Sequence, residues 1–210
     1  MLISELAKEV HENAVAHGWW DEDRQPPEIL ALIHSEWSEA LEEARAGMPM
    51  AYIIVHDGWQ GDPHEAIVER GQDGKYMYCG KEYSGKPEGV AVELIDGCIR
   101  ILDYIGKLDV IEHGSDESDM PVEHLYEKMP FGDAERPWDN LPGLIAYLHL
   151  YTSGVLNIKE KCPVGRALQL LLAMSYALSW VKQQGLDPLA ILLEKHAYNK
   201  TRPYKHGKKF

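Results

Sequence analysis

The sequence predicts an all-α helical bundle that carries a small β-hairpin-like insertion. Long segments place apolar residues three and four positions apart, which is the period of an amphipathic helix. Glycine and proline stand at the ends of these segments, where they terminate or begin helices. The helical period is lost over residues 48–86, where glycine and tyrosine become frequent. We therefore expect a single domain over residues 1–210, interrupted by an insertion at 48–86.

The helix boundaries follow from local signals. Pro26 and Pro27 suit the opening turn of a helix, and Asp187 followed by Pro188 suits an N-cap and a first helical position. Gly185 separates this last helix from the one before it. The predicted helices cover about residues 3–17, 28–46, 87–108, 141–157, 164–184 and 186–200.

The non-helical parts are of two kinds. In the insertion, "AYIIVH" (51–56) and "KYMYCGKEY" (75–83) have the composition of two short strands. A polar, proline-containing connection follows residue 108, and the apolar helices after it contain no second pair of acids. We interpret residues 109–186 as an extra linker and helices that serve packing or oligomerisation.

Composition and charge exclude some classes of function. The net charge of −13 disfavours binding to nucleic acid or to an anionic membrane surface. The three cysteines are far apart and indicate neither a disulfide framework nor a zinc site. The first residues are too polar for a signal peptide, and the most apolar run, 167–181, is shorter than the roughly 20 residues that span a bilayer. We expect a cytoplasmic protein.

Two predicted helices carry acids beside apolar faces. On the second helix, Glu36, Glu39 and Glu43 fall at one edge of the apolar face. Taken alone, this edge is typical of a solvated flank. The third helix is apolar around most of its circumference, and yet it contains Glu93 and Asp96.

Buried carboxylates are tolerated when they are paired, hydrogen-bonded or bound to a cation. Arg100 lies one turn beyond Asp96 and can neutralise one acid, and Asp103 is a further candidate partner for Arg100. If this stripe faces Glu36 and Glu39, four carboxylates converge. An all-oxygen set favours Mg²⁺, with Mn²⁺ as the second choice.

The C-terminal segment supplies the opposite charge. From Lys195 to Phe210 it contains six Lys or Arg and no acid. Lys195, Asn199 and Arg202 are spaced three and four residues apart, and Lys208 follows a glycine. This concentration of donors can bind a triphosphate. A disordered basic terminus is the alternative interpretation.

These residues resemble a known family. "HSEWSEALEE" supplies Glu-x-x-Glu, "VELID" supplies Glu-x-x-Asp, and "KHAYNKTRPYKHGKKF" is similar to a closing Lys-x-x-x-Asn-x-x-Arg-x-x-x-His-Gly-Lys pattern. In this order they resemble the MazG-like all-α nucleoside triphosphate pyrophosphohydrolases, which are related to the dimeric dUTPases. The matching segments cover about residues 17–46, 87–106 and 194–210, and the insertion makes the gap between the acidic pairs longer than is usual in the family.

The resemblance implies a Mg²⁺-dependent enzyme that converts a (deoxy)nucleoside triphosphate to the monophosphate and pyrophosphate. It also implies a homodimer or homotetramer. Trp20 is a candidate for stacking on the nucleobase, although packing at a helix junction explains it equally well. Which carboxylate acts as general base stays open, with Glu43 as a candidate. The alternative is a catalytically silent helical oligomerisation or nucleotide-binding protein. The implied metal ligands are Glu36, Glu39, Glu93 and Asp96, and the implied substrate-binding residues are Lys195, Asn199, Arg202 and Lys208.

Overall fold

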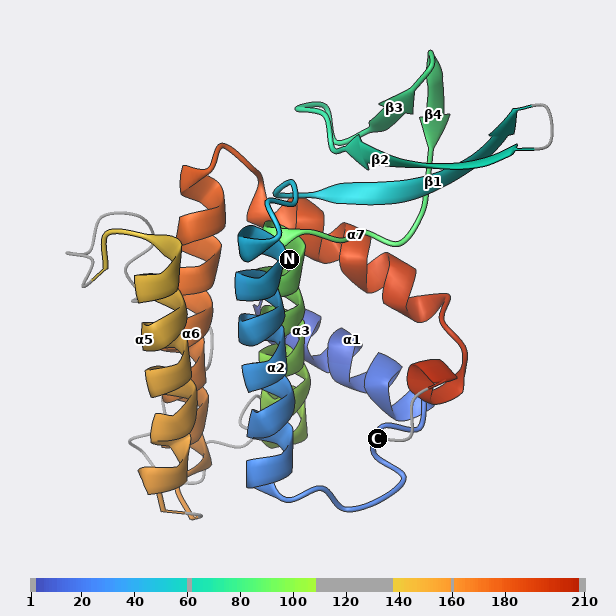
Figure 1. Ribbon diagram of the computed structural model, residues 1–210. Helices are drawn as coiled ribbons and strands as arrows, with labels where there is room; N and C mark the ends of the chain where they lie inside the picture. The colour runs from blue at the N-terminus through green and yellow to red at the C-terminus, as the bar shows by residue number, and fades with distance from the viewer. Residues whose placement is uncertain (1–2, 60–61, 109–137, 160, 208–210) are drawn as a thin grey trace.

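The chain forms a mainly helical bundle with a small β-insertion at one end, as the computed structural model in Figure 1 shows. The described residues are 3–59, 62–108, 138–159 and 161–207. The helices are α1 (Ile3–Ala16), α2 (Pro26–Arg45), α3 (Val90–Leu108), α5 (Leu141–Gly154), α6 (Pro163–Gln183) and α7 (Pro188–Lys200). Two 3₁₀ turns, η1 (Val155–Asn157) and η2 (Tyr204–Gly207), follow α5 and α7. These boundaries confirm the mainly α-helical prediction.

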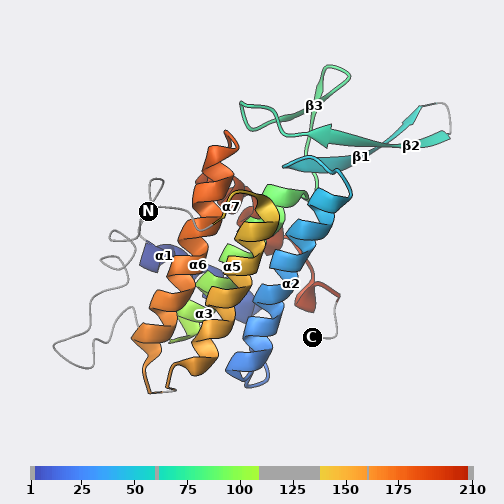
Figure 2. The ribbon, with the colours of Figure 1, turned by 60° about the vertical axis from the view of Figure 1, so that its left-hand side comes forward.

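Helix α3 lies at the centre of the bundle. It contacts α1, α2, α6 and α7, while α5 packs against α2 and α6. Figure 2 shows α5 beside α6 and α2, in front of α3. The interior is continuous and aliphatic, with Leu94, Ile95, Ile101 and Leu102 of α3 fully buried. This central position explains why α3 is apolar around most of its circumference.

A glycine allows α2 and α3 to approach closely. A Cβ atom at Gly97 would overlap the ring of Trp37, which is fully buried on α2. The Trp37 indole also donates a hydrogen bond to Oγ1 of Thr152 on α5, at 3.0 Å. Trp37 therefore fixes α2 against both of its neighbours.

The predicted caps explain where several helices begin. Asp187 accepts hydrogen bonds from the backbone N–H groups of Leu189 and Ala190, which would otherwise lack partners at the start of α7. Asn140 does the same for Gly143 at the start of α5. Gly185 has a φ of +82° and ends α6 in a left-handed turn.

Helix α6 is long and apolar enough to cross a membrane by length and composition alone. However, 61% of its most apolar window is buried inside the protein. The helix packs against α3 and α5 in the main core. This agrees with the expected core role, and the absence of a membrane partner stays a prediction.

The insertion contains more strands than the sequence indicated. Strands β1 (Tyr52–Trp59) and β2 (Asp62–Glu69) form one antiparallel hairpin, and β3 (Tyr76–Tyr78) and β4 (Lys81–Tyr83) form another. The prediction of a single strand over "KYMYCGKEY" is wrong, because the segment turns back at Cys79 and Gly80. Both residues have positive φ, 49° and 78°, as tight hairpin turns require. A separate small core of Ile53, Val55, Val68 and Tyr76 holds the insertion together.

Two contacts attach the insertion to the bundle. The Arg70 guanidinium donates to Glu194 of α7 at 3.0 Å, and Tyr52 forms a backbone bridge with Glu88 just before α3. The carbonyl group of Pro49 also accepts from Val90. The insertion is therefore anchored at the start of α3 and on α7.

The C-terminal segment folds back against the first helix. The backbone N–H of Lys205 donates to the carbonyl oxygen of His17 at 2.9 Å, and the His17 imidazole bonds the carbonyl oxygen of Arg202 at 3.0 Å. The Tyr204 ring lies directly over Gly18, where no side chain would fit. This packing brings the basic segment beside the loop between α1 and α2.

Candidate functional site

Three acids from two helices converge between α2 and α3. Glu36 projects from α2, and Glu93 and Asp96 project from adjacent turns of α3. One carboxylate oxygen from each lies within 4.8 Å of the others. The sequence predicted that the two acidic helices face each other, and the structure brings these three of the four expected ligands together.

Burial makes the charged form of this cluster costly. Glu36 is 5% exposed and Glu93 is 7% exposed. Burial, reinforced by the negative charge of Asp96, raises the pKa of Glu93 to about 8. Burial also raises the pKa of Glu36, against the lowering effect of Arg100. Without a further cation, Glu93 therefore holds a proton at neutral pH.

Arg100 pairs with a different acid from the one expected. Its guanidinium Nε bonds Oε1 of Glu36 across the interface between α2 and α3. The expected pair with Asp96, one turn away on the same helix, is not the contact that forms. The cross-helix pair satisfies the deeply buried Glu36, which has no other cation within reach among the described ion pairs.

Lys195 lies inside the acidic cluster. Its Nζ is 2.9 Å from Oδ2 of Asp96 and donates to the carbonyl oxygen of Pro87 at 2.8 Å. The Lys195 residue is only 1% exposed. The sequence placed this ammonium group on phosphate, whereas in the structure it acts as the counter-ion of a predicted metal ligand.

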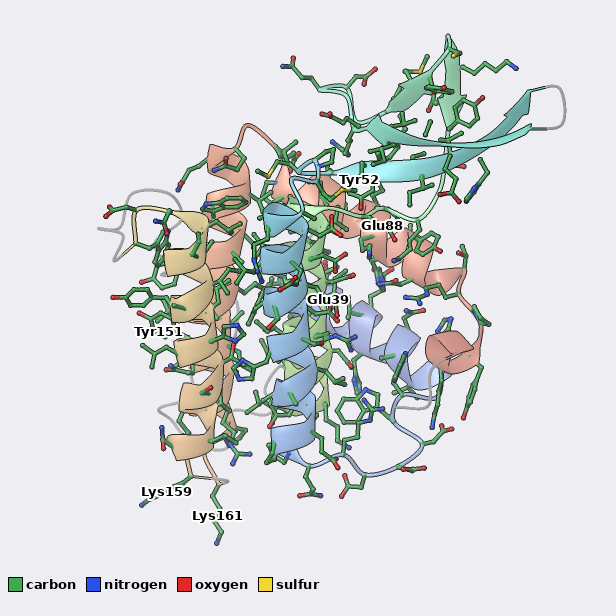
Figure 3. The ribbon with its side chains drawn as sticks, viewed as in Figure 1. Glu39, Tyr52, Glu88, Tyr151, Lys159 and Lys161 are labelled. Carbon is green, nitrogen blue, oxygen red and sulfur yellow. The ribbon has the colours of Figure 1, made fainter. Side chains whose placement is uncertain are left out.

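Glu39 and Glu43 lie outside the cluster of three. Glu39 is exposed, although its charge contributes to the raised pKa of Glu93. Oε2 of Glu43 accepts a hydrogen bond from the Tyr52 hydroxyl at 3.2 Å. Figure 3 shows Glu39, Tyr52 and Glu88 along the side of α2 that is turned away from α5. Glu39 is thus close enough to influence the cluster, and Glu43 is engaged by the insertion.

A cleft of about 90 Å³ opens beside the acids. Its walls come from α1, α2, α3, α7 and the loop between α1 and α2. The charged and polar side chains in these walls belong to both signs. They are Asn13, Arg24, Glu36, Asp96, Arg100, Asp103, His196, Asn199 and Arg202.

Two of the predicted phosphate ligands line this cleft. Arg202 and Asn199 face it from the end of α7 and the turn that follows. The side-chain oxygen of Asn199 is buried and has no hydrogen-bond partner among the described residues. A buried amide oxygen without a partner is costly, so a ligand or water that donates to it would be stabilised. Lys208, the remaining predicted ligand, lies outside the described residues.

Trp20 is held at the rim of the cleft. Its indole N–H donates to Oδ1 of Asp103 at 2.9 Å, and the same oxygen lies 2.7 Å from Nδ1 of His11. Asp103 therefore binds Trp20 and His11, whereas the sequence suggested that it pairs with Arg100. Lys107 also lies over the Trp20 ring, 5.2 Å from its centroid. The ring is fixed at a helix junction and still borders the cleft, so both interpretations of Trp20 stay open.

The sequence argument missed two residues of the cleft. His196 is 3% exposed, and burial lowers the pKa of its imidazole. Arg24 enters from the loop before α2 and lies 5.2 Å from the Trp19 ring. Helical spacing could have found His196, because Leu192, His196 and Asn199 share one face of α7. No comparable periodicity marks Arg24, which lies in a loop.

The arrangement has two chemical halves. Glu36, Glu93 and Asp96 offer oxygen ligands of the kind that hard divalent cations bind. Arg24 and Arg202 offer guanidinium donors of the kind that bind phosphate oxygens. The fold and the site thus define a mainly helical protein with a mixed-charge cleft at an acidic helix interface. Comparison with known protein families, with curated proteins and with solved structures finds no match.

Proposed function

We propose that the chain is a Mg²⁺-dependent pyrophosphohydrolase of MazG-like type, which converts a (deoxy)nucleoside triphosphate to the monophosphate and pyrophosphate. The observation that carries the proposal is the convergence of Glu36, Glu93 and Asp96 beside a cleft lined by arginines. The sequence motifs and the geometry support it independently, because the motifs were chosen by spacing and the cluster by distance.

The acids are suited to a hard cation. Glu36, Glu93 and Asp96 would hold Mg²⁺ through carboxylate oxygens, with Glu39 at the exposed edge to complete the set. The cation supplies neutralisation of phosphate charge and acidification of water. Its binding favours loss of the proton from Glu93, because a cation stabilises the charged form of a neighbouring carboxyl group.

The other half of the cleft is suited to the triphosphate. Arg202 and Arg24 can donate to phosphate oxygens, and they stabilise the negative charge of a pyrophosphate leaving group. Asn199 presents its buried oxygen to a donor on the ligand or on water. Trp20 and Trp19 supply aromatic surface at the same rim, where a base can stack.

Lys195 has a modified role in this proposal. The residue neutralises Asp96 in the described structure. A divalent cation at Asp96 must therefore share this carboxylate with the ammonium group or displace it. A displaced Lys195 would be free to move toward phosphate, the role that the sequence motif suggested.

One observation favours the second candidate, a catalytically silent nucleotide-binding or oligomerisation protein. Arg100 and Lys195 already pair with two of the three acids, and a protonated Glu93 leaves the cluster without net charge. An ion-pair network of this kind can be purely structural. The expected homodimer or homotetramer is compatible with both candidates and stays a prediction.

A turnover screen tests the proposal. The metal-free protein is incubated with each dNTP and NTP, with and without Mg²⁺, and pyrophosphate and monophosphate are measured. The enzyme proposal predicts Mg²⁺-dependent release of both products in equal amounts from at least one nucleotide. No release above that of a no-protein control, from any nucleotide, would leave the silent network as the better account.

A further inference from the structure

A pair of histidines lies on the opposite side of α2 from the acidic cluster. Nδ1 of His34 on α2 is 2.7 Å from Nδ1 of His149 on α5. The two rings are nearly parallel, with an interplanar angle of 19° and centroids 4.9 Å apart. Both side chains are half-buried. Neither residue belongs to the sequence motifs or to the cleft.

From this pair we infer a second metal site, a two-histidine site for a divalent transition ion such as Zn²⁺, Ni²⁺ or Cu²⁺. Neutral imidazole nitrogens are ligands that these ions prefer, whereas Mg²⁺ prefers oxygen. The inference concerns α2 and α5 and does not depend on the proposed nucleotide chemistry.

The distance between the nitrogens is close to the one that a shared ion requires. Zinc–nitrogen bonds of about 2.0–2.1 Å at angles between 90° and tetrahedral place two ligand atoms roughly 2.9–3.4 Å apart. His34 and His149 therefore need to separate by only a few tenths of an ångström and turn toward a common point. Water molecules would complete the coordination on the exposed side.

A third side chain sets the tautomer that metal binding needs. Oγ of Ser153, one turn after His149 on α5, is 3.1 Å from Nε2 of His34. When Nε2 of His34 carries the proton and donates to Ser153, its Nδ1 lone pair is free for a ligand bond. Metal-binding histidines are commonly oriented in this way through the other ring nitrogen.

The proton between the rings can be replaced without a change in charge. With His34 protonated at Nε2, the hydrogen of the short contact belongs to Nδ1 of His149. An ion that takes the place of this hydrogen requires His149 to carry its single proton on Nε2 instead. Burial lowers the pKa of His149, which favours the neutral ring in both tautomers.

The helix interface holds the two imidazoles in place. One turn further along, Trp37 of α2 donates to Thr152 of α5 at 3.0 Å, and both residues are fully buried. This bond fixes the register of α2 against α5. A small loss of side-chain entropy on metal binding is expected for such a preorganised pair.

The test measures Zn²⁺ and Ni²⁺ binding to the EDTA-treated full chain by isothermal titration calorimetry. The variants are His34→Ala and His149→Ala, and the control is His56→Ala, which removes an exposed histidine of β1. We expect the wild type and His56→Ala to bind one ion with equal affinity at this site, and each of the other two variants to lose at least tenfold. Equal binding by all four proteins would overturn the site and assign any bound ion to other residues.

Two further measurements protect the test from unfolding and from the acidic cluster. Asp96→Asn should retain the Zn²⁺ binding, because the two sites share no ligand. X-ray absorption at the zinc edge should detect two imidazole ligands in the wild type and fewer in His149→Gln, whose amide preserves much of the side-chain volume. Identical spectra for the two proteins would also overturn the inference.

Discussion

Nζ of Lys195 lies 2.9 Å from Oδ2 of Asp96, and this contact joins α7 to α3 inside the protein. The ammonium group is almost completely buried and also donates to the carbonyl oxygen of Pro87. A buried charge of this kind needs its partner, because an unpaired ion loses its hydration without compensation. Asp96 therefore serves two purposes, as the counter-ion of Lys195 and as a ligand in the proposed metal site.

Replacing Lys195 by Met should destabilise the metal-free protein. Removing one partner of a buried pair costs about 3–5 kcal/mol, because Asp96 is left uncompensated. Urea unfolding in EDTA measures this loss, and added Mg²⁺ should restore part of it by neutralising the same acids. Lys200→Met is the control, since Lys200 is exposed one turn beyond and bonds Glu9. Equal stability of the two variants would refute the buried counter-ion.

Neutralising the acids should abolish turnover without unfolding the chain. Asp96→Asn and Glu39→Gln are each expected to reduce Mg²⁺-dependent pyrophosphate release by about 100-fold or more, the scale seen when one electrostatic group of an active site is removed. Glu42→Gln is the control, because Glu42 is exposed on the same helix and pairs with Arg45. Full activity in both test variants would remove the metal assignment, and full activity in Glu39→Gln alone would limit the ligands to the three converging acids.

Glu93 should make the metal-free protein less stable as pH rises. Its pKa is about 8 in the folded chain, against an ordinary value of 4.5. Between these values the folded state binds a proton that the unfolded state has released, so the free energy of unfolding falls with increasing pH. This contribution is fully present below pH 4.5 and is lost as pH passes through about 8.

The variant Glu93→Gln isolates this effect, because its side chain is neutral at every pH. In EDTA, its stability relative to the wild type should increase by about 2 kcal/mol or more between roughly pH 5 and pH 8. Parallel stability curves for the two proteins would contradict the raised pKa. Saturating Mg²⁺ should reduce the difference in slope, because the cation stabilises the ionised carboxyl group.

Gly97→Ala should weaken the contact between α2 and α3. The added methyl group would overlap the buried Trp37 ring, and overpacking of this kind costs typically about 1–3 kcal/mol. Thermal and urea unfolding measure the change. Gly154→Ala is the matched control on α5, where the methyl group meets the movable end of the Gln169 side chain. A stability loss no larger at Gly97 than at Gly154 would show that α2 and α3 tolerate a wider spacing.

Local signals predicted the helices well. Asp187 with Pro188 and the left-handed glycine at 185 act within one turn, so their effect can be read without the rest of the fold. The insertion was harder. Strand β2 contains Pro63 and several charges, and its pairing with β1 is a non-local relationship that alternation alone did not indicate.

The acidic site was predictable within each helix and less so between helices. Spacing placed Glu93 and Asp96 on one stripe, and it required a neighbour for them. It could not specify that Arg100 reaches Glu36 across the interface, because side-chain direction depends on the packing of both helices. Nor could it show that Lys195 turns inward, since that depends on where α7 docks.

The most direct test of the central claim is the position of Mn²⁺ in crystals of the protein, located by anomalous scattering. Mn²⁺ replaces Mg²⁺ at oxygen sites and is visible where Mg²⁺ is not. The account predicts a peak bonded to carboxylate oxygens of Glu36, Glu93 and Asp96, with the contact between Lys195 and Asp96 lengthened or broken. A crystal at saturating Mn²⁺ with no peak there, and with the Lys195–Asp96 pair intact, would contradict the proposed metal site.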